Sequence, residues 1–526
     1  MAKLLGWLLR TLEADALVHF SLSYKGCICA AVLLGILSGC GYAPLRMWPV
    51  TLGALALAML LSAKASGPGK NFLVIWLYFA ALDANCLSWL NYVMEGFGEM
   101  HPALSWTVVL IFSGYLAVPY ALLALAAKGL SRGRETAYLC FFLPCALTAA
   151  DFIIGWLLSG FPWMYFGYTC LEGPFSGFAP LAGVRGISAL FVLCAGCAAL
   201  GAARHYLYLP VCALIFATGI LINGTEYTQA GPGITVSMVQ GNIQQSLKWD
   251  PQRVQTSIDT YWLNTLPVLG HSKLVIWPET AMPIHSDFLA PLLSQINAEG
   301  LNSHTVIATG ILRRAEPYSY NSILILGEKV EPGPDFEHYD KRHLVPFGEY
   351  VPLEQYLRHL GKIFTMPVSS FKAPEDPPEP LPAAGVLFLP AICYDAIFPE
   401  HLASADRPEA SGIMMLSNDA WFGTTRGPLE HLDIARMRSM ELQKPMLRST
   451  NNGVTAGIDH LGRIIQALPQ NETGVLTLDF VPRKGQTPYS RWGNIPLLIF
   501  MTLLFLLGLY KARVREPKDK LEQLVR

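Results

Sequence analysis

Charged residues are scarce in this sequence. Only 15% of its 526 residues are Asp, Glu, Lys or Arg, whereas soluble domains carry about 25%. Apolar residues make up 52%, and the formal net charge is −1 with no long basic block. The low charge indicates that part of the chain lies in lipid, with the bilayer as a partner, and the lack of a basic field excludes nucleic acid.

Long apolar runs are abundant. A membrane-spanning helix needs about 20 mostly apolar residues, and seven such runs precede residue 224 while an eighth lies near the C-terminal end. No short apolar segment with a small-residue cleavage site precedes them, so we expect the N-terminus to be retained. The predicted spans are residues 26–43, 46–63, 71–90, 105–127, 137–158, 186–203, 206–223 and 494–511.

Loop charges predict the orientation of these spans. Lys and Arg residues near span ends stay in the cytoplasm, and here they follow the second, fourth and sixth spans, whereas residues 160–184 contain none. The N-terminus is then cytoplasmic, and seven crossings put the long polar segment on the outer face. We therefore predict a membrane domain at 1–223, an outer domain at 224–492, and a final span with a cytoplasmic tail at 493–526.

The outer segment has the pattern of an α/β domain. Short apolar runs such as ITVSMVQ, KLVIWPE and GIMMLSND are typical of buried strands. Residues 251–265, 286–299 and 428–442 have helical spacing, and the proline-rich stretch Phe371–Ala384 predicts an ordered loop. No repeat of 20 to 50 residues is present, which excludes solenoids and propellers.

This outer segment holds a single cysteine. Cys393 ends the apolar run LPAIC before a predicted helix, whereas the other ten cysteines lie in apolar runs between Cys27 and Cys212. A helix N-terminus lowers the pKa of a thiol. Cys393 is therefore a candidate nucleophile, and a buried inert thiol is the alternative.

Two other strand ends carry suitable partners. Glu279 follows a strand in VIWPETAMP, and Lys341 precedes Glu349 across a Pro-Phe-Gly turn in HYDKRHLVPFGEYVP. Taken singly, these residues are typical of exposed carboxylates and solvated ion pairs. Together with Cys393 they form a chemical set, because a thiol nucleophile needs a base and a cation that stabilises the oxyanion. Glu279 is the candidate base and Lys341 the candidate cation.

The order of these three residues resembles the Glu-Lys-Cys triad of the nitrilase superfamily. Within it, the chain is similar to the apolipoprotein N-acyltransferase family, in the segments SMVQGNIQQSLKWD, WPET, KRHLVPFGEYVP, AICYD, SNDAWFG and LRSTNNG. The resemblance implies a polytopic α-helical membrane protein with eight transmembrane helices. It also implies a nitrilase-like α-β-β-α sandwich inserted between helices 7 and 8, on the periplasmic side of a bacterial inner membrane.

The resemblance also assigns roles to further residues. It implies three supporting residues: Glu349, which orients the lysine; Tyr394, beside the nucleophile, which matches a position implicated in substrate handling; and Asp395, with a role in lid contacts. For substrate binding the resemblance implies Trp249, and Trp163 at the lipid entry, with anchoring at the membrane interface as the alternative for Trp163. Trp421 is a candidate for lining the pocket, with a plain strand-end turn as the alternative. One departure is Asp395, where the family commonly has a glutamate, so that the carboxylate is kept but is one methylene shorter.

The activity implied by the resemblance is a two-step ping-pong acyl transfer. Cys393 takes a fatty acyl chain from a phospholipid such as phosphatidylethanolamine, and the thioester is passed to the α-amine of a diacylglyceryl-cysteine in an apolipoprotein. We expect no cofactor and a monomer. No metal is expected either, because His338 and His343 bracket Lys341 without a cluster of metal-ligand spacing. The alternatives are a membrane-bound amidase or nitrilase hydrolase, and a transporter or scaffold without activity.

Overall fold

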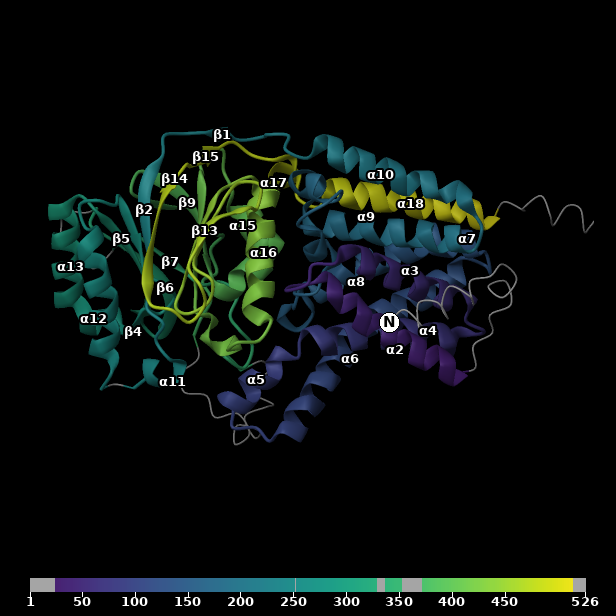
Figure 1. Ribbon diagram of the computed structural model, residues 1–526, viewed down its shortest axis with the longest axis horizontal. Coiled ribbons are helices and arrows are strands. Elements are labelled where there is room, and N and C mark those ends of the chain that lie inside the picture. The colour runs from purple at the N-terminus through teal and green to yellow at the C-terminus, as the bar shows by residue number, and fades with distance from the viewer. Residues whose placement is uncertain (1–23, 251, 329–335, 352–370, 514–526) are drawn as a thin grey trace, which may run out of the picture.

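The computed structural model describes residues 24–250, 252–328, 336–351 and 371–513. A bundle of apolar helices lies beside an α/β part, and α18 returns to the bundle after the last strand (Figure 1). The predicted tail after Arg513 lies outside the described residues. The bundle helices are α2 (Tyr24–Ser38), α3 (Trp48–Lys64), α4 (Pro68–Cys86), α5 (Trp89–Gly96), α6 (Pro102–Leu130), α8 (Leu143–Ile154), α9 (Ala179–Ala202), α10 (Leu209–Ile222) and α18 (Ile495–Arg513).

All the predicted spans fall on apolar helices of the described chain. Five helical segments have the length and hydropathy of a membrane span, and α4 with α5 makes a sixth if that bent pair is counted as one. The segments Trp48–Lys64 and Tyr206–Ile222 are shorter apolar helices. The chain therefore carries a membrane-embedded helical part, as the composition predicted.

The predicted span over residues 71–90 falls on two helices, α4 and α5. The chain bends by 55° between α4 and α5, and α5 continues to Gly96. The side chains at the break bond to the backbone, since Ser88 Oγ donates to the carbonyl of Asn85 (2.9 Å) and Asn91 Nδ2 to that of Ser88 (3.1 Å). Such local bonds compete with the helical ladder and favour a break.

Two sheets lie face to face in the α/β part. Within the first sheet β2, β3 and β5 run parallel, and within the second β9, β10 and β11 do so. The first sheet has the order β14 (Gly474–Phe480), β2 (Ile234–Gln240), β3 (Leu274–Ile276), β5 (Val306–Ala315), β6 (Tyr318–Leu326), β7 (His338–Asp340), with β4 (Met282–His285) beside β5. The second has the order β13 (Ile464–Ala467), β12 (Ala456–Ile458), β11 (Met446–Thr450), β10 (Gly412–Ser417), β9 (Val386–Ile392), β8 (Leu381–Ala383).

Helices cover the outer faces of both sheets. The first is covered by α12 (Val254–Thr265) and α13 (Ala290–Ser303), and the second by α15 (Pro399–Ala405) and α16 (Gly427–Leu442) (Figure 1). Apolar side chains from both sheets form the core between them. The central strands are continuous apolar runs because both of their faces are buried. The layers follow the order expected of an α-β-β-α sandwich.

One expected loop contains a strand. Within Phe371–Ala384, the residues of β8 pair antiparallel with β9, with Leu381 and Ala383 buried and Pro382 exposed. The alternation suits an edge strand, where a proline need not donate to a neighbouring strand. The prediction of a strand-free loop is therefore wrong at this point.

Helix α16 joins the sandwich to the bundle. Arg46 makes two hydrogen bonds to Asp433 (2.8 and 3.0 Å), and the backbone N–H of Val184 donates to Glu441 (2.7 Å). Nearer the start of α16, Trp163 Nε1 donates to Glu430 Oε2 (2.9 Å). These bonds fix α16, which lies directly behind the site described next.

Candidate active site

Glu279, Lys341 and Cys393 come from three separate strands and are all buried. Glu279 follows β3, Lys341 follows β7 and Cys393 follows β9, with exposed fractions of 6%, 1% and 9%. The first two strands belong to one sheet and the third to the other. The facing sheets therefore bring the three predicted residues into one region.

Lys341 lies between two carboxylates. Its Nζ is 3.2 Å from Glu279 Oε1 and 3.0 Å from Glu349 Oε1, and Asn321 Nδ2 donates to the same two oxygens at 2.8 and 3.1 Å. Burial by itself lowers the pKa of Lys341, but the two carboxylates hold that pKa well above its usual range. Lys341 is therefore a fixed cation, with Glu349 placed to orient it.

The second oxygen of Glu279 is held by the segment SNDAWFG. Its Oε2 accepts from the backbone N–H of Asn418 at 2.9 Å. Strand β5 also packs closely against the backbone around Glu279. A Cβ at Gly310, on β5, would lie 2.4 Å from the carbonyl oxygen of Pro278 and 2.5 Å from the nitrogen of Thr280. Only glycine fits at Gly310, and Glu279 is locked in place.

Cys393 begins a five-residue 3-10 segment with φ of 48°. The prediction that a helix N-terminus lowers the pKa of the thiol is wrong. Burial raises that pKa, the charge of Glu279 raises it further, and Lys341 and a hydrogen bond from Ser417 oppose the shift. The short helix aligns too few dipoles to offset burial. The thiol is protonated at neutral pH and needs a base.

A buried polar chain lies behind the nucleophile. His431 Nε2, on α16, is 3.2 Å from the carbonyl oxygen of Cys393, and Nδ1 is 3.1 Å from Asp419 Oδ1. Asp419 also accepts from Ser417 Oγ (2.8 Å) and Arg448 (2.7 Å). A residue with positive φ needs such support. Our sequence analysis missed His431, because only the packing of α16 on the second sheet places it here.

Tyr394 and Asp395 anchor the turn that follows the nucleophile. Tyr394 OH donates to the carbonyl of Gly160, in the bundle, at 3.1 Å. Asp395 is fully buried, and its carboxylate accepts from Ile392 N (3.0 Å), Arg342 N (3.2 Å), His343 N (2.8 Å) and Tyr339 OH (2.9 Å). Asp395 thus links the turn of Cys393 to the segment of Lys341.

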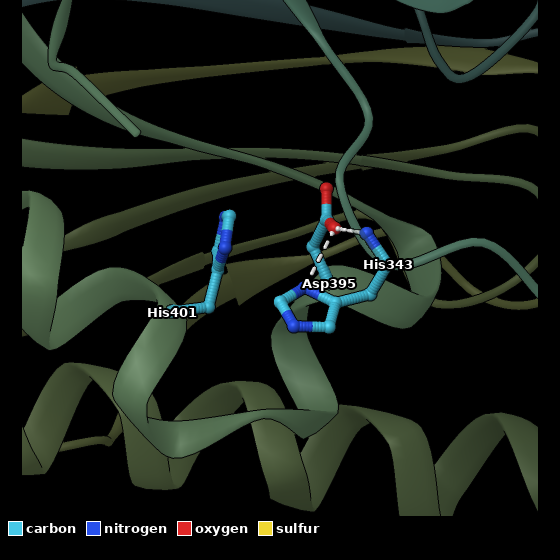
Figure 2. A group of neighbouring side chains, drawn as sticks. All are labelled: His343, Asp395 and His401. Carbon is cyan, nitrogen blue, oxygen red and sulfur yellow. Dashed lines mark hydrogen bonds and ion pairs between the residues drawn. The ribbon is translucent and has the colours of Figure 1, made fainter. Parts of the chain in front are cut away.

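One group near this link has donors suited to a metal. Figure 2 shows His343, Asp395 and His401 together, with one donor atom of each within 4.8 Å of the others. Our sequence analysis expected no metal and missed this group, which only the tertiary structure assembles. Hydrogen bonds already engage both oxygens of Asp395, and His401 Nε2 is 2.9 Å from Tyr339 OH. We interpret the group as hydrogen-bonded support for the Lys341 segment.

The three tryptophans implied in substrate binding have different surroundings. Trp249 is half-buried, directly after α11 (Gln245–Lys248), and its indole N–H has no partner among the described residues. Trp421 is half-buried and packs edge-on against Phe97, with ring centroids 4.9 Å apart. Trp163 is only 3% exposed and stacks on His431 at 5.7 Å. The position of Trp163 supports His431, and contact of all three with substrate stays a prediction.

Comparisons with known proteins match both parts of the chain. The family model of the apolipoprotein N-acyltransferase N-terminal domain matches residues 34–197, and that of carbon-nitrogen hydrolases matches 235–488. The apolipoprotein N-acyltransferase of Vibrio cholerae is 34% identical over 484 residues, which cover 90% of this chain and 95% of the relative. This chain belongs to the apolipoprotein N-acyltransferase family.

A second relative and a solved structure are also similar to this chain. The apolipoprotein N-acyltransferase of Azotobacter vinelandii is 37% identical over 92% of this chain and 95% of its own. An amidase from Nesterenkonia sp. covers 53% of this chain and 99% of its own at 13% identity, with a TM-score of 0.36. Similarity to apolipoprotein N-acyltransferases thus extends over membrane helices and sandwich alike.

Proposed function

We propose that this family member transfers a fatty acyl chain from a phospholipid to the α-amine of a diacylglyceryl-cysteine in an apolipoprotein, through a thioester on Cys393. The observation that carries the proposal is the buried site itself. A protonated thiol, a locked carboxylate and a fixed cation lie together in a membrane-embedded member of this acyltransferase family.

In the first half-reaction, Glu279 accepts the proton of the Cys393 thiol, and the thiolate attacks the ester carbonyl carbon of the phospholipid. Lys341 stabilises the oxyanion that forms, in a site from which water is largely excluded. When the tetrahedral intermediate collapses, the ester bond breaks and the leaving oxygen takes the proton back from Glu279. A lysophospholipid leaves, and the acyl chain stays on Cys393 as a thioester.

In the second half-reaction, the neutral α-amine of the apolipoprotein attacks the thioester carbonyl. Glu279 accepts a proton from the attacking nitrogen, and Lys341 again stabilises the oxyanion. The carbon–sulfur bond breaks, and the thiolate is reprotonated by Glu279. The product carries an amide-linked acyl chain, and the free enzyme is restored without a cofactor.

The membrane arrangement suits these substrates. We infer eight transmembrane helices, with the sandwich of residues 224–492 inserted between the seventh and eighth, on the periplasmic side of a bacterial inner membrane. The loop charges and the eight apolar helical segments support this topology. Because donor and acceptor are both lipid-anchored, a site held at the bilayer meets them in two dimensions. We also infer that the enzyme acts as a monomer on a donor such as phosphatidylethanolamine.

Intact-protein mass spectrometry tests the thioester. After incubation with a defined phosphatidylethanolamine, we expect a mass increase of one acyl chain that disappears when a diacylated lipopeptide is added. Cys393→Ala should show neither the increase nor product. Acylation of the lipopeptide by purified Cys393→Ala would contradict the mechanism. Steady release of free fatty acid without lipopeptide would instead indicate the hydrolase alternative.

A further inference from the structure

A second lysine lies against the candidate base. Lys248 ends α11, its side chain is buried at 2% exposure, and its Nζ donates to the carbonyl oxygen of Glu279 at 2.9 Å. This is the one hydrogen bond of its ammonium group to another described residue. An ammonium group is costly to bury unless negative charge lies near it.

The negative charge near Lys248 belongs to the catalytic set. Burial lowers the pKa of Lys248 to about 8, and the groups that oppose this shift are Glu279 and Cys393. Lys248 therefore remains mostly charged at neutral pH, although no carboxylate oxygen pairs with its ammonium directly among the described residues. A structural role alone would be met at lower cost by an apolar side chain.

The charges of the site explain why a second cation is needed. Glu279 and Glu349 share Lys341, so these three residues alone carry one excess negative charge in a buried place. Of the neighbouring buried acids, Asp419 pairs with Arg448, and the carboxylate of Asp395 is held by backbone N–H groups and by His343. Forming an oxyanion next to an uncompensated negative charge is unfavourable.

We propose that Lys248 is a positioning residue that fixes Glu279 through its carbonyl and neutralises the excess charge of the site. With Lys248 charged, the charges of the two glutamates and the two lysines sum to zero. That sum, taken with the oxyanion, is still zero when Glu279 holds the thiol proton, because the negative charge has moved from Glu279 to the oxyanion. The inference rests on the proposed function.

Hydrogen bonds also connect the helix that carries Lys248 to Glu279. Gln245, on the same short helix, accepts from Asn418 Nδ2 (2.7 Å), and Asn418 holds the other side of Glu279 through its backbone N–H (2.9 Å). Helix α11 thus bonds to Glu279 directly through Lys248 and indirectly through Asn418, and Trp249 follows the helix.

The test is the pH dependence of acyl-enzyme formation in Lys248→Met, which keeps length without charge. Loss of the cation makes ionised Glu279 less stable, so the acid limb of the pH–rate profile should move to higher pH by about one unit, with a rate about 10-fold lower at neutral pH. Lys248→Arg retains the charge and should keep the limb near the wild-type position. Lys444→Met is the control for loss of a buried lysine elsewhere, because Lys444 pairs with Asp406 and bonds to Ala410 and Gly485; its acid limb should stay at the wild-type position.

An unshifted acid limb in Lys248→Met would overturn the inference, whether or not the rate falls, because loss of packing lowers the rate equally at all pH values. Glu279→Gln is measured in parallel. If that variant still formed the acyl-enzyme at the wild-type rate, the proposed base would be wrong instead. The two failures are therefore distinguishable.

Discussion

At the scale of single residues, the structure shows a role for Asp395 that the sequence did not predict. From the family resemblance, this position differed only in having an aspartate where relatives commonly have a glutamate. In the fold it is fully buried and accepts four hydrogen bonds from the backbone and from Tyr339, which join the turns of Cys393 and Lys341. An ionised carboxylate suits such a place because all the facing groups are donors. Burial opposes ionisation, but His401 and His343 hold the pKa of Asp395 below its usual range.

Asp395→Asn tests this link. The amide would place an N–H₂ group against backbone donors, at a cost of about 1–3 kcal/mol. We expect lower thermal stability and an acyl-enzyme rate reduced about 10-fold or more. Asp395→Glu keeps the acceptor pair and should lose less. Asp479→Asn, at an exposed carboxylate on β14, is the control and should change neither quantity. Wild-type stability and rate in Asp395→Asn would contradict the assigned role.

A neighbouring residue predicts a pH dependence of stability. Burial lowers the pKa of His401 to about 4, whereas an unfolded histidine has a pKa of about 6.5. Between these values the unfolded chain binds more protons, so stability falls as the pH drops from 6.5 to 4, by on the order of 1–3 kcal/mol. Melting temperatures in detergent should show a shallower slope in this window for His401→Gln. The exposed His271→Gln should keep the wild-type slope.

At the scale of elements, α16 connects the bundle to the nucleophile. One side of the helix bonds to the membrane part through Glu430, Asp433 and Glu441. From the same helix, His431 reaches the carbonyl of Cys393. The burial of α16 on all sides explains why its sequence lacks a clear polar face.

Removal of the His431 imidazole should affect the nucleophile without removing any reacting group. In His431→Leu the carbonyl of Cys393 loses its partner, a cost of about 1–3 kcal/mol, and we expect acyl-enzyme formation to slow about 10-fold. His431→Gln offers an amide donor and should recover part of the rate. Met437→Leu, a volume-conserving change on the same helix, is the control. A normal rate in His431→Leu would show that the polar chain has no part in the reaction.

At the scale of the whole molecule, the topology can be tested directly. A cysteine at Ser294, exposed on α13, should react with a membrane-impermeant maleimide in intact spheroplasts. A cysteine at Ser66, in the loop between α3 and α4, should react only after the membrane is opened. These expectations follow from placing the sandwich on the periplasmic side. The reverse labelling pattern would contradict the inferred orientation.

The sequence by itself determined the features that depend on short stretches of chain. Apolar length predicted where the bundle helices lie, and apolar runs predicted the central strands. The triad could be named because each member follows a recognisable strand end within a motif. The bend within the span at residues 71–90 was not predicted; there Ser88 and Asn91 bond to the backbone and favour a break in the helix.

Only the tertiary structure decided the electrostatics of the site. The protonated state of Cys393, the second cation at Lys248, the support from His431 and the link through Asp395 all depend on residues far apart in the sequence. Burial and hydrogen bonding set these properties, and both depend on which elements pack together. Hydropathy is a property of neighbouring residues, whereas the charge balance of a buried site depends on every element that meets there.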